Sequence, residues 1–516
     1  MQMLSKTASS LGVKVLVVMA LTFLFAVAYA QSPLYTSNQN QYFLHGLARA
    51  GLGSLEQDWQ ANTLDPTPVF SALVEYIYRL TRFEAIFYLC YAALLGIYLV
   101  SLLGIAASLF ASYDEAQKNV FLIVLVSMLV VIHSAALRFF LSRILSENWT
   151  YLFEDGVADQ RILGPVFQPS AFGVLLVTSI HLFMQKRPYL AILLAVLAAT
   201  FHPTYLLSAA VLTALYLFLT WTSDRNLGRV LSLALFSLLI VAPILFYALV
   251  SFAGTSSDIA AQAREILVSY RIPHHAQVGQ WLDSTVAIKA MIILVALYLA
   301  RRSRMLFSIL LGSTLMAVLL TLVQALLGSN LLALLFPWRL SIFIVPLSTS
   351  LILAACAAWM IRLARGARGR INGLKILSGA AILLAVLIGA IRFKLDLDRK
   401  AADPAQALYT YVNLHQQSGD LYLTPIKLQD FRLESAAPVF VDFKSIPYKD
   451  TDVLEWYRRV RRADEYYQRQ DCELLKNIIA DEKISHVVLE TDFEMTVCPD
   501  LHLLYQDQSY TLLRSD

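Results

Sequence analysis

The residues of this chain that could do chemistry are acids, arginines and histidines in the connections between long apolar segments. The connection 31–84 contains Glu56 and Asp58. A carboxylate in a partly buried pocket at a membrane surface can have its pKa tuned and can then act as a general base. We expect Asp58 to be this base, with Glu56 as the second choice. Three neighbours could form the walls of a pocket for a sugar or a lipid head group: Tyr42, His45 and Trp59.

These residues also have a purely structural interpretation. Acids of this kind often cap helices that lie on a membrane surface, and Trp59 would then be an interfacial anchor. The residue types alone favour this plainer interpretation, so the catalytic hypothesis for Asp58 needs support from elsewhere in the chain.

A second connection, 140–170, combines clustered acids with an arginine. Clustered carboxylates can bind a divalent cation through their oxygen atoms, and the candidates are Glu154, Asp155 and Asp159. Their spacing matches no specific metal motif, so a solvated loop is the plainer interpretation. Arg161 stands just before the next apolar segment, where its guanidinium could hold a phosphate through paired hydrogen bonds.

Two later connections place histidine beside proline. His202 precedes Pro203 between two apolar segments, and an ionisable group near membrane depth is costly and therefore a functional candidate. The alternative is a turn in which Pro203 starts a helix. The run Arg271-Ile272-Pro273-His274-His275 could bind an anionic head group or supply a proton near neutral pH. A polar surface loop is the alternative there.

The run Phe336-Pro337-Trp338-Arg339 opens another apolar segment. The helix dipole favours anions at a helix start, so a cation at Arg339 is not explained by the dipole. Anion binding by Arg339, with Trp338 beside the substrate, is one interpretation. Snorkelling of the arginine beside an interfacial tryptophan is the other.

The elements that must position these residues are apolar helices. The chain has 58% hydrophobic and 15% charged residues and a mean hydropathy of +0.60, values typical of a multi-span membrane protein. The formal net charge of +4 gives no indication of a nucleic-acid partner. About eleven segments are candidate spans: 13–30, 85–110, 120–139, 171–184, 189–201, 204–221, 230–252, 286–299, 305–327, 340–361 and 376–393. Segments 171–184, 189–201 and 286–299 are short for a full crossing.

The distribution of lysine and arginine sets the expected orientation. Short basic connections alternate with the connections that carry the chemical motifs, and the rule that positive charge stays inside places the basic ones in the cytoplasm. The N-terminus is then cytoplasmic, and 31–84 and the C-terminal residues lie outside. This orientation requires a chain reversal at His202-Pro203. The first apolar segment resembles a signal peptide, but its length favours an uncleaved first span.

The composition changes near residue 397. Residues 1–396 form the predicted membrane domain, and 397–516 become charged, with strand-like runs at 420–424, 438–443, 486–491 and 510–513 and helix-like runs at 452–468 and 472–479. We predict a small extracytoplasmic α/β domain. A disulfide between Cys472 and Cys498 is compatible with that location, but the sequence does not show whether the two residues approach each other.

The spans, the acid in the first long connection and the basic residues in later ones resemble the GT-C superfamily of polytopic membrane glycosyltransferases. The resemblance implies a catalytic acid in the first extracytoplasmic loop, a sugar donor linked to a polyprenyl phosphate, and often a soluble C-terminal domain. Asp58, with Glu56, occupies the position of that acid. The donor phosphate site would comprise Arg161, His202, Arg271, His274, His275 and Arg339.

The segments Asp430-Phe431-Arg432 and Val441-Asp442-Phe443-Lys444 also resemble a group of bacterial membrane proteins of unknown function. The combined hypothesis is an integral enzyme of the bacterial plasma membrane. It would transfer a sugar from a polyprenyl-phosphate donor to an extracytoplasmic lipid, glycan or protein acceptor.

Two other classes of protein remain as alternatives. A transporter or flippase of lipid-linked material needs ionisable residues deep in its spans, where the sequence offers His133, His181 and little else. A non-catalytic scaffold would use the C-terminal domain to bind a partner. The sequence identifies no definite cofactor, and a divalent cation is the candidate that the clustered acids offer.

Overall fold

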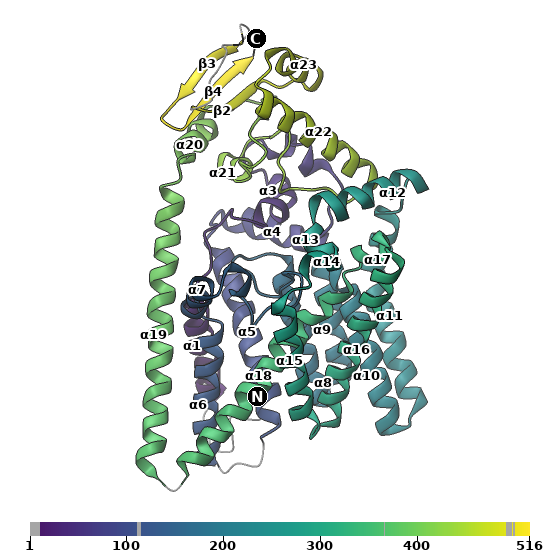
Figure 1. Ribbon diagram of the computed structural model, residues 1–516, viewed down its shortest axis with the longest axis vertical. Coiled ribbons are helices and arrows are strands. Elements are labelled where there is room, and N and C mark those ends of the chain that lie inside the picture. Colours follow the sequence, from purple (N-terminus) through teal and green to yellow (C-terminus); the bar gives the residue numbers. More distant parts are fainter. Residues whose placement is uncertain (1–10, 111–114, 366, 492–497, 499–500, 516) are drawn as a thin grey trace. The chain divides into compact units, whose positions relative to one another are not determined.

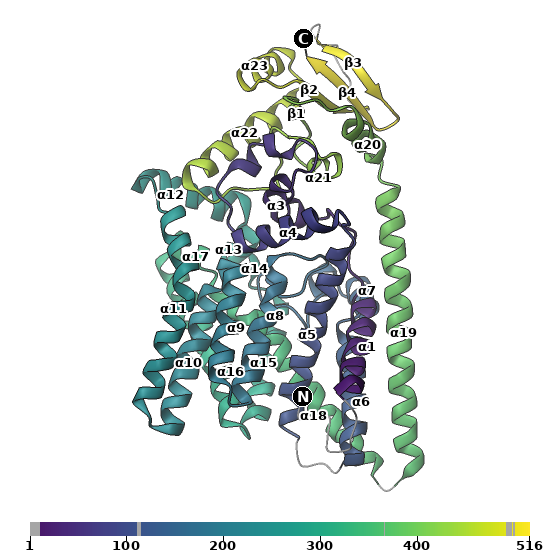
Figure 2. The ribbon, with the colours of Figure 1, turned by 180° about the vertical axis from the view of Figure 1, so that it is seen from behind.

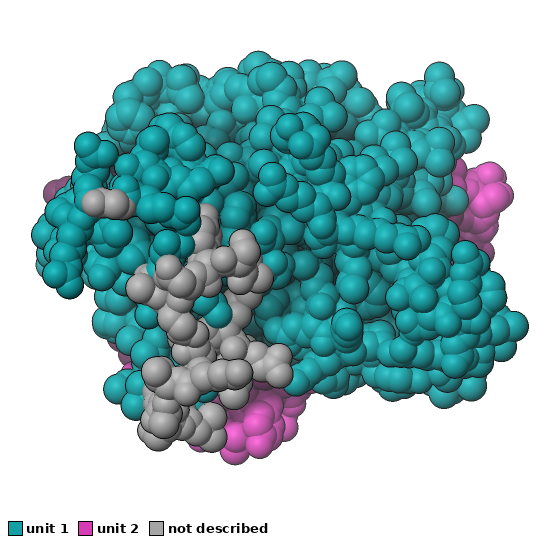
Figure 3. Space-filling model, turned by 90° about the horizontal axis from the view of Figure 1, so that it is seen from below, with its two compact units in different colours: residues 1–31, 87–245, 271–394 teal, residues 32–86, 246–270, 395–516 magenta. Residues whose placement is uncertain are grey.

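The computed structural model describes residues 11–110, 115–365, 367–491, 498 and 501–515 (Figure 1). Contacts divide the chain into two compact units, coloured differently in Figure 3. The first, which we call the helical unit, contains residues 1–31, 87–245 and 271–394. The second, which we call the mixed unit, contains residues 32–86, 246–270 and 395–516. Each unit is formed by three segments that are distant from one another in the sequence.

The helical unit is built from apolar helices with short connections (Figures 1 and 2). Its helices, some of which extend beyond the unit boundary, are α1 (Leu11–Tyr29), α5 (Ile86–Ser108), α6 (Glu115–Ile132), α7 (Ala135–Ile144), α8 (Val174–Met184), α9 (Pro188–Phe201), α10 (Leu206–Asp224), α11 (Leu227–Ser251), α13 (Pro273–Ala276), α14 (Val278–Trp281), α15 (Ser284–Ala300), α16 (Arg304–Leu327), α17 (Asn330–Leu334), α18 (Ser341–Ala364) and α19 (Arg368–Ala401).

These helices confirm the predicted membrane body. Within the described residues, seven helices are long and apolar enough to cross a membrane, and α6 with α7, which bend by 50°, make an eighth if they form one span. Three shorter apolar helices cover the three segments that the sequence marked as short: Pro169–Met184, Pro188–Phe201 and Ser284–Ala300. The chain is therefore an integral membrane protein with a mainly helical fold.

The chain reverses at His202-Pro203, as the charge pattern required. The start of α10 lies beside the start of α8, because Tyr205 donates a hydrogen bond to the Ser170 carbonyl over 2.7 Å. Further along both helices, Phe183 of α8 stacks on Tyr216 of α10 with ring centroids 4.2 Å apart. Helices α8 and α10 thus run in the same direction. Because α9 connects them, it runs in the opposite direction to both.

The mixed unit combines helices with one small sheet. Its helices are α2 (Gln39–Tyr42), α3 (Leu44–Arg49), α4 (Pro68–Thr81), α12 (Ser257–Glu265), α20 (Gln406–His415), α21 (Phe431–Ser435), α22 (Asp450–Arg469) and α23 (Cys472–Glu482). Its strands are β1 (Tyr422–Leu423), β2 (His486–Glu490), β3 (Leu501–Gln506) and β4 (Tyr510–Ser515). The strand order is β1-β2-β4-β3, with β1 parallel to β2 and the other pairs antiparallel.

The predicted strand at 438–443 is wrong, and β3 was not predicted. In the first of these segments only Val439 forms a bridge, to Tyr422. The bridge is made by the amide of Tyr422, which donates to the Pro438 carbonyl over 3.1 Å, and by the amide of Phe440, which donates to the Tyr422 carbonyl over 2.8 Å. The amide of Val439 takes no part in this bridge and donates to the side chain of Asp58 over 2.9 Å.

A disulfide joins Cys472, at the start of α23, to Cys498, with a Cα–Cα distance of 5.5 Å. The two cysteines are therefore close enough to be bonded, which the sequence did not show. It closes a loop with a sequence separation of 26. Closing a loop of this length removes conformational freedom from the unfolded chain, which stabilises the folded unit.

We expect the double variant Cys472→Ser, Cys498→Ser to destabilise the mixed unit by about 3 kcal/mol, from the loss of this loop constraint. Resistance to protease in lipid nanodiscs would measure the effect. The matched control is Cys90→Ser with Cys356→Ser, because both of these cysteines are free. Recovery of Cys472 and Cys498 as alkylated thiols from unreduced protein would contradict the prediction.

Candidate anion-binding site around residues 154–160

A tight turn lies in the connection between α7 and α8. The amide of Gly156 donates to the carbonyl of Gln160 over 2.8 Å. Ala158 and Asp159 inside the turn have φ angles of 58° and 53°. Two consecutive residues with side chains in this left-handed region store strain that the surrounding structure must offset. The turn therefore depends on contacts from elsewhere in the helical unit.

Lys289 from α15 supplies two of these contacts. Its buried Nζ donates to the carbonyl of Gly156 over 2.6 Å and lies 2.7 Å from a carboxylate oxygen of Asp155. The amide of Val157 donates to the hydroxyl of Ser341, at the start of α18, over 2.9 Å. These contacts place the backbone of the turn between two helices that are far away in the sequence.

Histidine and arginine contact the second half of the turn. His275 of α13 donates its Nδ1–H to the carbonyl of Ala158 over 2.7 Å. Arg339, from the turn Pro337–Leu340 that precedes α18, donates to the side chain of Gln160 and to the hydroxyl of Thr204. It also donates to Nε2 of His202 over 3.2 Å. Arg339 is thus held by neutral acceptors and keeps its positive charge at the turn.

A second group of charges surrounds Glu154. A carboxylate oxygen of Glu154 lies 3.5 Å from Nη1 of Arg138, on α7. The guanidinium of Arg161 stacks over the Tyr151 ring at 4.0 Å, and that of Arg138 lies 5.4 Å from the same ring. Among the described residues, Arg161 has this stacking contact and no ion pair. The planar donors of Arg161 are therefore presented without a protein carboxylate bound to them.

Burial changes the protonation of the two acids. Loss of solvent raises the pKa of Glu154 to about 7, although Arg138 acts in the opposite direction. Burial likewise raises the pKa of Asp155 to about 6, against the lowering effect of Lys289. Both oxygens of Glu154 are buried and have no hydrogen-bond partner among the described residues. Glu154 is therefore a carboxyl group that can exchange a proton near neutral pH.

Two histidines that were expected in the donor phosphate site, His202 and His275, lie at the turn, and burial lowers the pKa of each. Burial, followed by the neighbouring His274, lowers the pKa of His275 to about 3. Burial and Arg339 lower the pKa of His202 well below its usual value. Both rings are therefore neutral near pH 7, so the positive charge at the turn comes from the arginine and not from the histidines.

The structure brings many of the predicted phosphate-site residues together in the helical unit. His275 and Arg339 contact the turn, His202 contacts Arg339, and Arg161 follows the turn directly in the sequence and stacks on Tyr151. Arg271 is partly buried at the end of a π-helical segment, Ile266–Arg271, and His274 is exposed with its ring 4.1 Å from that of His275. Trp338 is buried and packs on Trp281, with ring centroids 5.2 Å apart.

The weak metal hypothesis is not supported by the geometry. Among the described residues, no group of three or more His, Cys, Asp or Glu side chains could hold a metal ion. Glu154 and Asp155 instead face Arg138 and Lys289, and Asp159 is exposed. Cationic side chains occupy the positions around these acids that a cation would need.

The first-connection residues belong to the mixed unit, where Asp58 is fully buried. One carboxylate oxygen of Asp58 accepts from the amides of Gln60 and Ala61 over 2.8 and 3.2 Å. The other accepts from Nε of Arg432 and from the amide of Val439 over 2.8 and 2.9 Å. Four donors therefore satisfy this carboxylate.

Arg432 completes the network by donating to Asp442 and to the hydroxyl of Ser445. A general base needs a lone pair that can reach a substrate proton. Asp58 has its oxygens engaged by four protein donors, so we revise its expected role from catalytic base to buried structural anion. Glu56, the second choice, is exposed on a short 3-10 helix, Leu55–Gln57.

The three predicted substrate-binding residues of this connection also have protein neighbours. The ring of Trp59 lies 4.3 Å from the guanidinium carbon of Arg459. His45 is buried, with Nε2 3.2 Å from the carbonyl of Thr63. Tyr42 is partly buried in α2. Trp59 and His45 thus have contacts that explain them as structural residues of the mixed unit.

Lys289 and Arg138 are the functional candidates that sequence reasoning missed. Both interrupt apolar runs that were taken as spans, and a charge within a span is itself a signal of function. The statement that ionisable residues in the spans amount to little more than His133 and His181 was therefore wrong. Lys289 and Arg138 supply the ammonium and guanidinium groups that face Asp155 and Glu154.

Comparisons with known proteins give one short family match and a distant likeness of fold. A domain of unknown function (DUF6798) matches residues 403–463, which contain both segments that resembled a group of unknown function. None of the curated proteins matches the chain.

Two crystal structures of ArnT from Cupriavidus metallidurans are similar over 98% of each chain. The structure bound to undecaprenyl phosphate has 12% identity and a TM-score of 0.45, and the apo structure has 14% and 0.47. Likeness at this level carries no functional argument, so the function must be argued from the site itself.

We expect Asp58→Asn to destabilise the mixed unit by about 3–5 kcal/mol, because Arg432 would lose one of its buried anionic partners. Thermal unfolding in lipid nanodiscs would measure the loss. Glu56→Gln is the matched control, since an exposed acid should change stability by less than about 0.5 kcal/mol. Equal stability of the two variants would contradict the structural role of Asp58.

We also expect Glu154 to make stability depend on pH. Its folded pKa of about 7 exceeds the value of about 4.3 for an unfolded glutamate, so the folded chain binds more protons between these values. The contribution of Glu154 to stability is therefore present below about pH 4 and is lost as the pH rises towards 7. Relative to Glu154→Gln, wild type should lose up to about 3 kcal/mol between pH 4 and 8.

Unfolding midpoints across this pH range would measure the difference. Glu147→Gln is the matched control, because Glu147 is an exposed acid in the same connection. Parallel pH curves for wild type and Glu154→Gln would show that the pKa of Glu154 is not raised.

Proposed function

We propose that this protein is a membrane glycosyltransferase that transfers a sugar from a polyprenyl-phosphate donor to an extracytoplasmic acceptor. The observation that carries the proposal is the pairing of Glu154, a buried acid with a pKa of about 7, with cationic side chains. Arg161 and Arg339 present positive charge to the same connection, and phosphate is the anion that arginine recognises well. A titratable acid beside an anion site is what such a transfer requires.

The proposed chemistry is a single displacement. The acceptor hydroxyl attacks the anomeric carbon while its proton passes to the carboxylate of Glu154. The bond between the anomeric carbon and the phosphate oxygen breaks, and the electron pair leaves with the polyprenyl phosphate. One inversion at the anomeric carbon follows from this route.

The cations stabilise the charge that develops on the departing phosphate. Arg339 is fixed by His202, Thr204 and Gln160 before any donor binds. A hydrogen-bond donor such as Arg339 that is already oriented needs little reorganisation, and therefore little free energy, when the transition state forms. The neutral histidines support this arrangement because they position the arginine and the turn without adding charge of their own.

The position of the buried cations favours surface chemistry over transport. Lys289 lies in the second turn of α15, and Arg138 lies in the first turn of α7. Their partners, Asp155 and Glu154, are in the connection between α7 and α8. These charges are therefore at helix ends, whereas a transport path needs them near the middle of the membrane.

The test is transfer of radiolabelled sugar by purified protein in lipid nanodiscs, from a panel of polyprenyl-phosphate donors. Glu154→Gln should bind donor normally and lose transfer by at least about 100-fold, as expected for loss of a general base. Arg339→Ala should weaken donor binding by about 10-fold or more, through loss of charge-assisted hydrogen bonds. Arg301→Gln, an exposed arginine in a different connection, is the control.

Three outcomes would change the proposal. Full transfer by Glu154→Gln would remove Glu154 as the base while keeping the reaction class. Movement of labelled donor across the bilayer without transfer would support a transporter. Donor binding and transfer absent from wild type across the whole panel would favour the scaffold alternative.

A further inference from the structure

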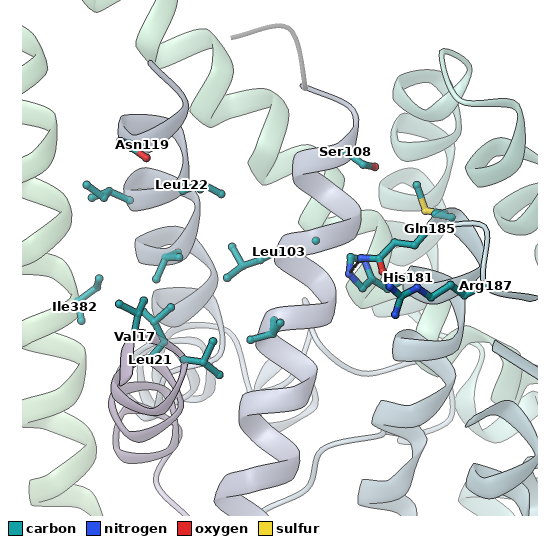
Figure 4. Close-up of a pocket in the computed structure, with 16 residues that line it drawn as sticks. Val17, Leu21, Leu103, Ser108, Asn119, Leu122, His181, Gln185, Arg187 and Ile382 are labelled. Atoms are coloured by element: carbon teal, nitrogen blue, oxygen red, sulfur yellow. Dashed lines mark hydrogen bonds between the residues drawn. The ribbon is translucent and has the colours of Figure 1, made fainter. Parts of the chain in front are cut away.

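A large groove lies in the helical unit, away from the turn at 154–160. Its volume is about 940 Å³, near the upper end of the ~300–1,000 Å³ typical of small-molecule sites. Side chains from α1, α5, α6, α8 and α19 line it, and residues after α8 close one end (Figure 4). None of the residues assigned to the candidate site lines this groove.

The groove and the candidate site occupy different ends of the same helices. On α5, the hydroxyl of Tyr91 donates to the carbonyl of Gly164 over 2.5 Å, near the connection that holds the candidate site. The groove uses the later part of α5, from Val100 to Ser108. It therefore opens towards the end that carries the short basic connections.

Most of the groove wall is aliphatic. Representative side chains are Leu21 on α1, Leu103 on α5, Leu122 and Val126 on α6, and Ile382 on α19. Water gains few hydrogen bonds against such a wall, and a space of this kind inside a bilayer is filled most favourably by hydrocarbon. The body of the groove thus fits an alkyl chain.

Polar side chains from three helix ends line the groove, on both sides of α5. Ser108 ends α5, Asn119 lies in the second turn of α6, and Gln185 and Arg187 follow α8 (Figure 4). The side-chain amide of Gln185 donates to Nε2 of His181 over 2.7 Å. Arg187 provides a cation where the aliphatic wall ends.

A second cation lies near the start of α6. Arg365, after α18, donates to the side chain of Gln117 over 3.2 Å, and Gln117 is in the first turn of α6, just before the groove-lining Asn119. Arg187 and Arg365 both have exposed side chains. Arg187 and Arg365 therefore each supply a positive charge near the polar part of the groove, which is complementary to a phosphate head group and unfavourable for a cationic one.

We propose that this groove binds an anionic phospholipid, with one acyl chain between α1, α5, α6 and α19 and its phosphate at Arg187. The aliphatic wall is complementary to an alkyl chain, and the cation Arg187 is complementary to a phosphate head group. The site is distinct from the proposed sugar-transfer site and does not depend on that function. It would hold a resident lipid between helices that otherwise leave a space among them.

The test is native mass spectrometry of the delipidated full-length protein with equimolar palmitoyl-oleoyl phosphatidylglycerol and phosphatidylcholine. Wild type should retain phosphatidylglycerol with about tenfold preference, the size expected from one charge-assisted contact. Leu103→Trp, which fills the groove, should abolish retention of both lipids at this site. Leu239→Trp is the matched control, because Leu239 is 65% exposed on α11 and lies outside the groove.

Arg187→Gln separates the head group from the chain. It leaves the aliphatic wall unchanged, so lipid should still be retained but the preference for phosphatidylglycerol should fall about tenfold. Retention by Leu103→Trp equal to that of Leu239→Trp would overturn the chain site. An unchanged lipid preference in Arg187→Gln would overturn the assigned head-group contact.

Discussion

The helical unit depends on one constraint, which is that charges buried at the ends of apolar helices must find partners. Lys289 meets this constraint by binding the carboxylate of Asp155 and the carbonyl of Gly156. An unpaired buried charge would cost several kcal/mol, so the turn and α15 must come together in the folded protein. The same turn then receives His275 and Arg339, which makes one ion pair the basis of a larger site.

Burial at this site acts differently on its histidines and on its acid. Burial makes His202 and His275 neutral near pH 7, while it raises the pKa of Glu154 towards neutrality. The arginines keep their charge throughout. The result is a fixed positive field beside one acid that can change protonation, and this division of roles is the physical basis of the proposed transfer reaction.

The mixed unit uses similar residue types for architecture. Asp58 and Arg432 form a buried pair in which the remaining hydrogen-bonding capacity of Asp58 is taken by backbone amides. Glu154 has no such donors among the described residues. The number of donors that reach the oxygens of each acid is a property of the fold and cannot be read from the residue type.

The sequence by itself determined the membrane helices, their short members, the reversal at His202-Pro203 and a helix over 452–468, which the structure has as α22 (Asp450–Arg469), because hydrophobic pattern and charge placement are local. It also identified the connection that holds Glu154 and Arg161. Only the tertiary structure decided the partners: Asp58 and Arg432 are 374 positions apart, and no local pattern encodes such a pairing. Lys289 is a charge inside an apolar run and is visible in the sequence, but its partners, Asp155 and the carbonyl of Gly156, were decided by the tertiary structure.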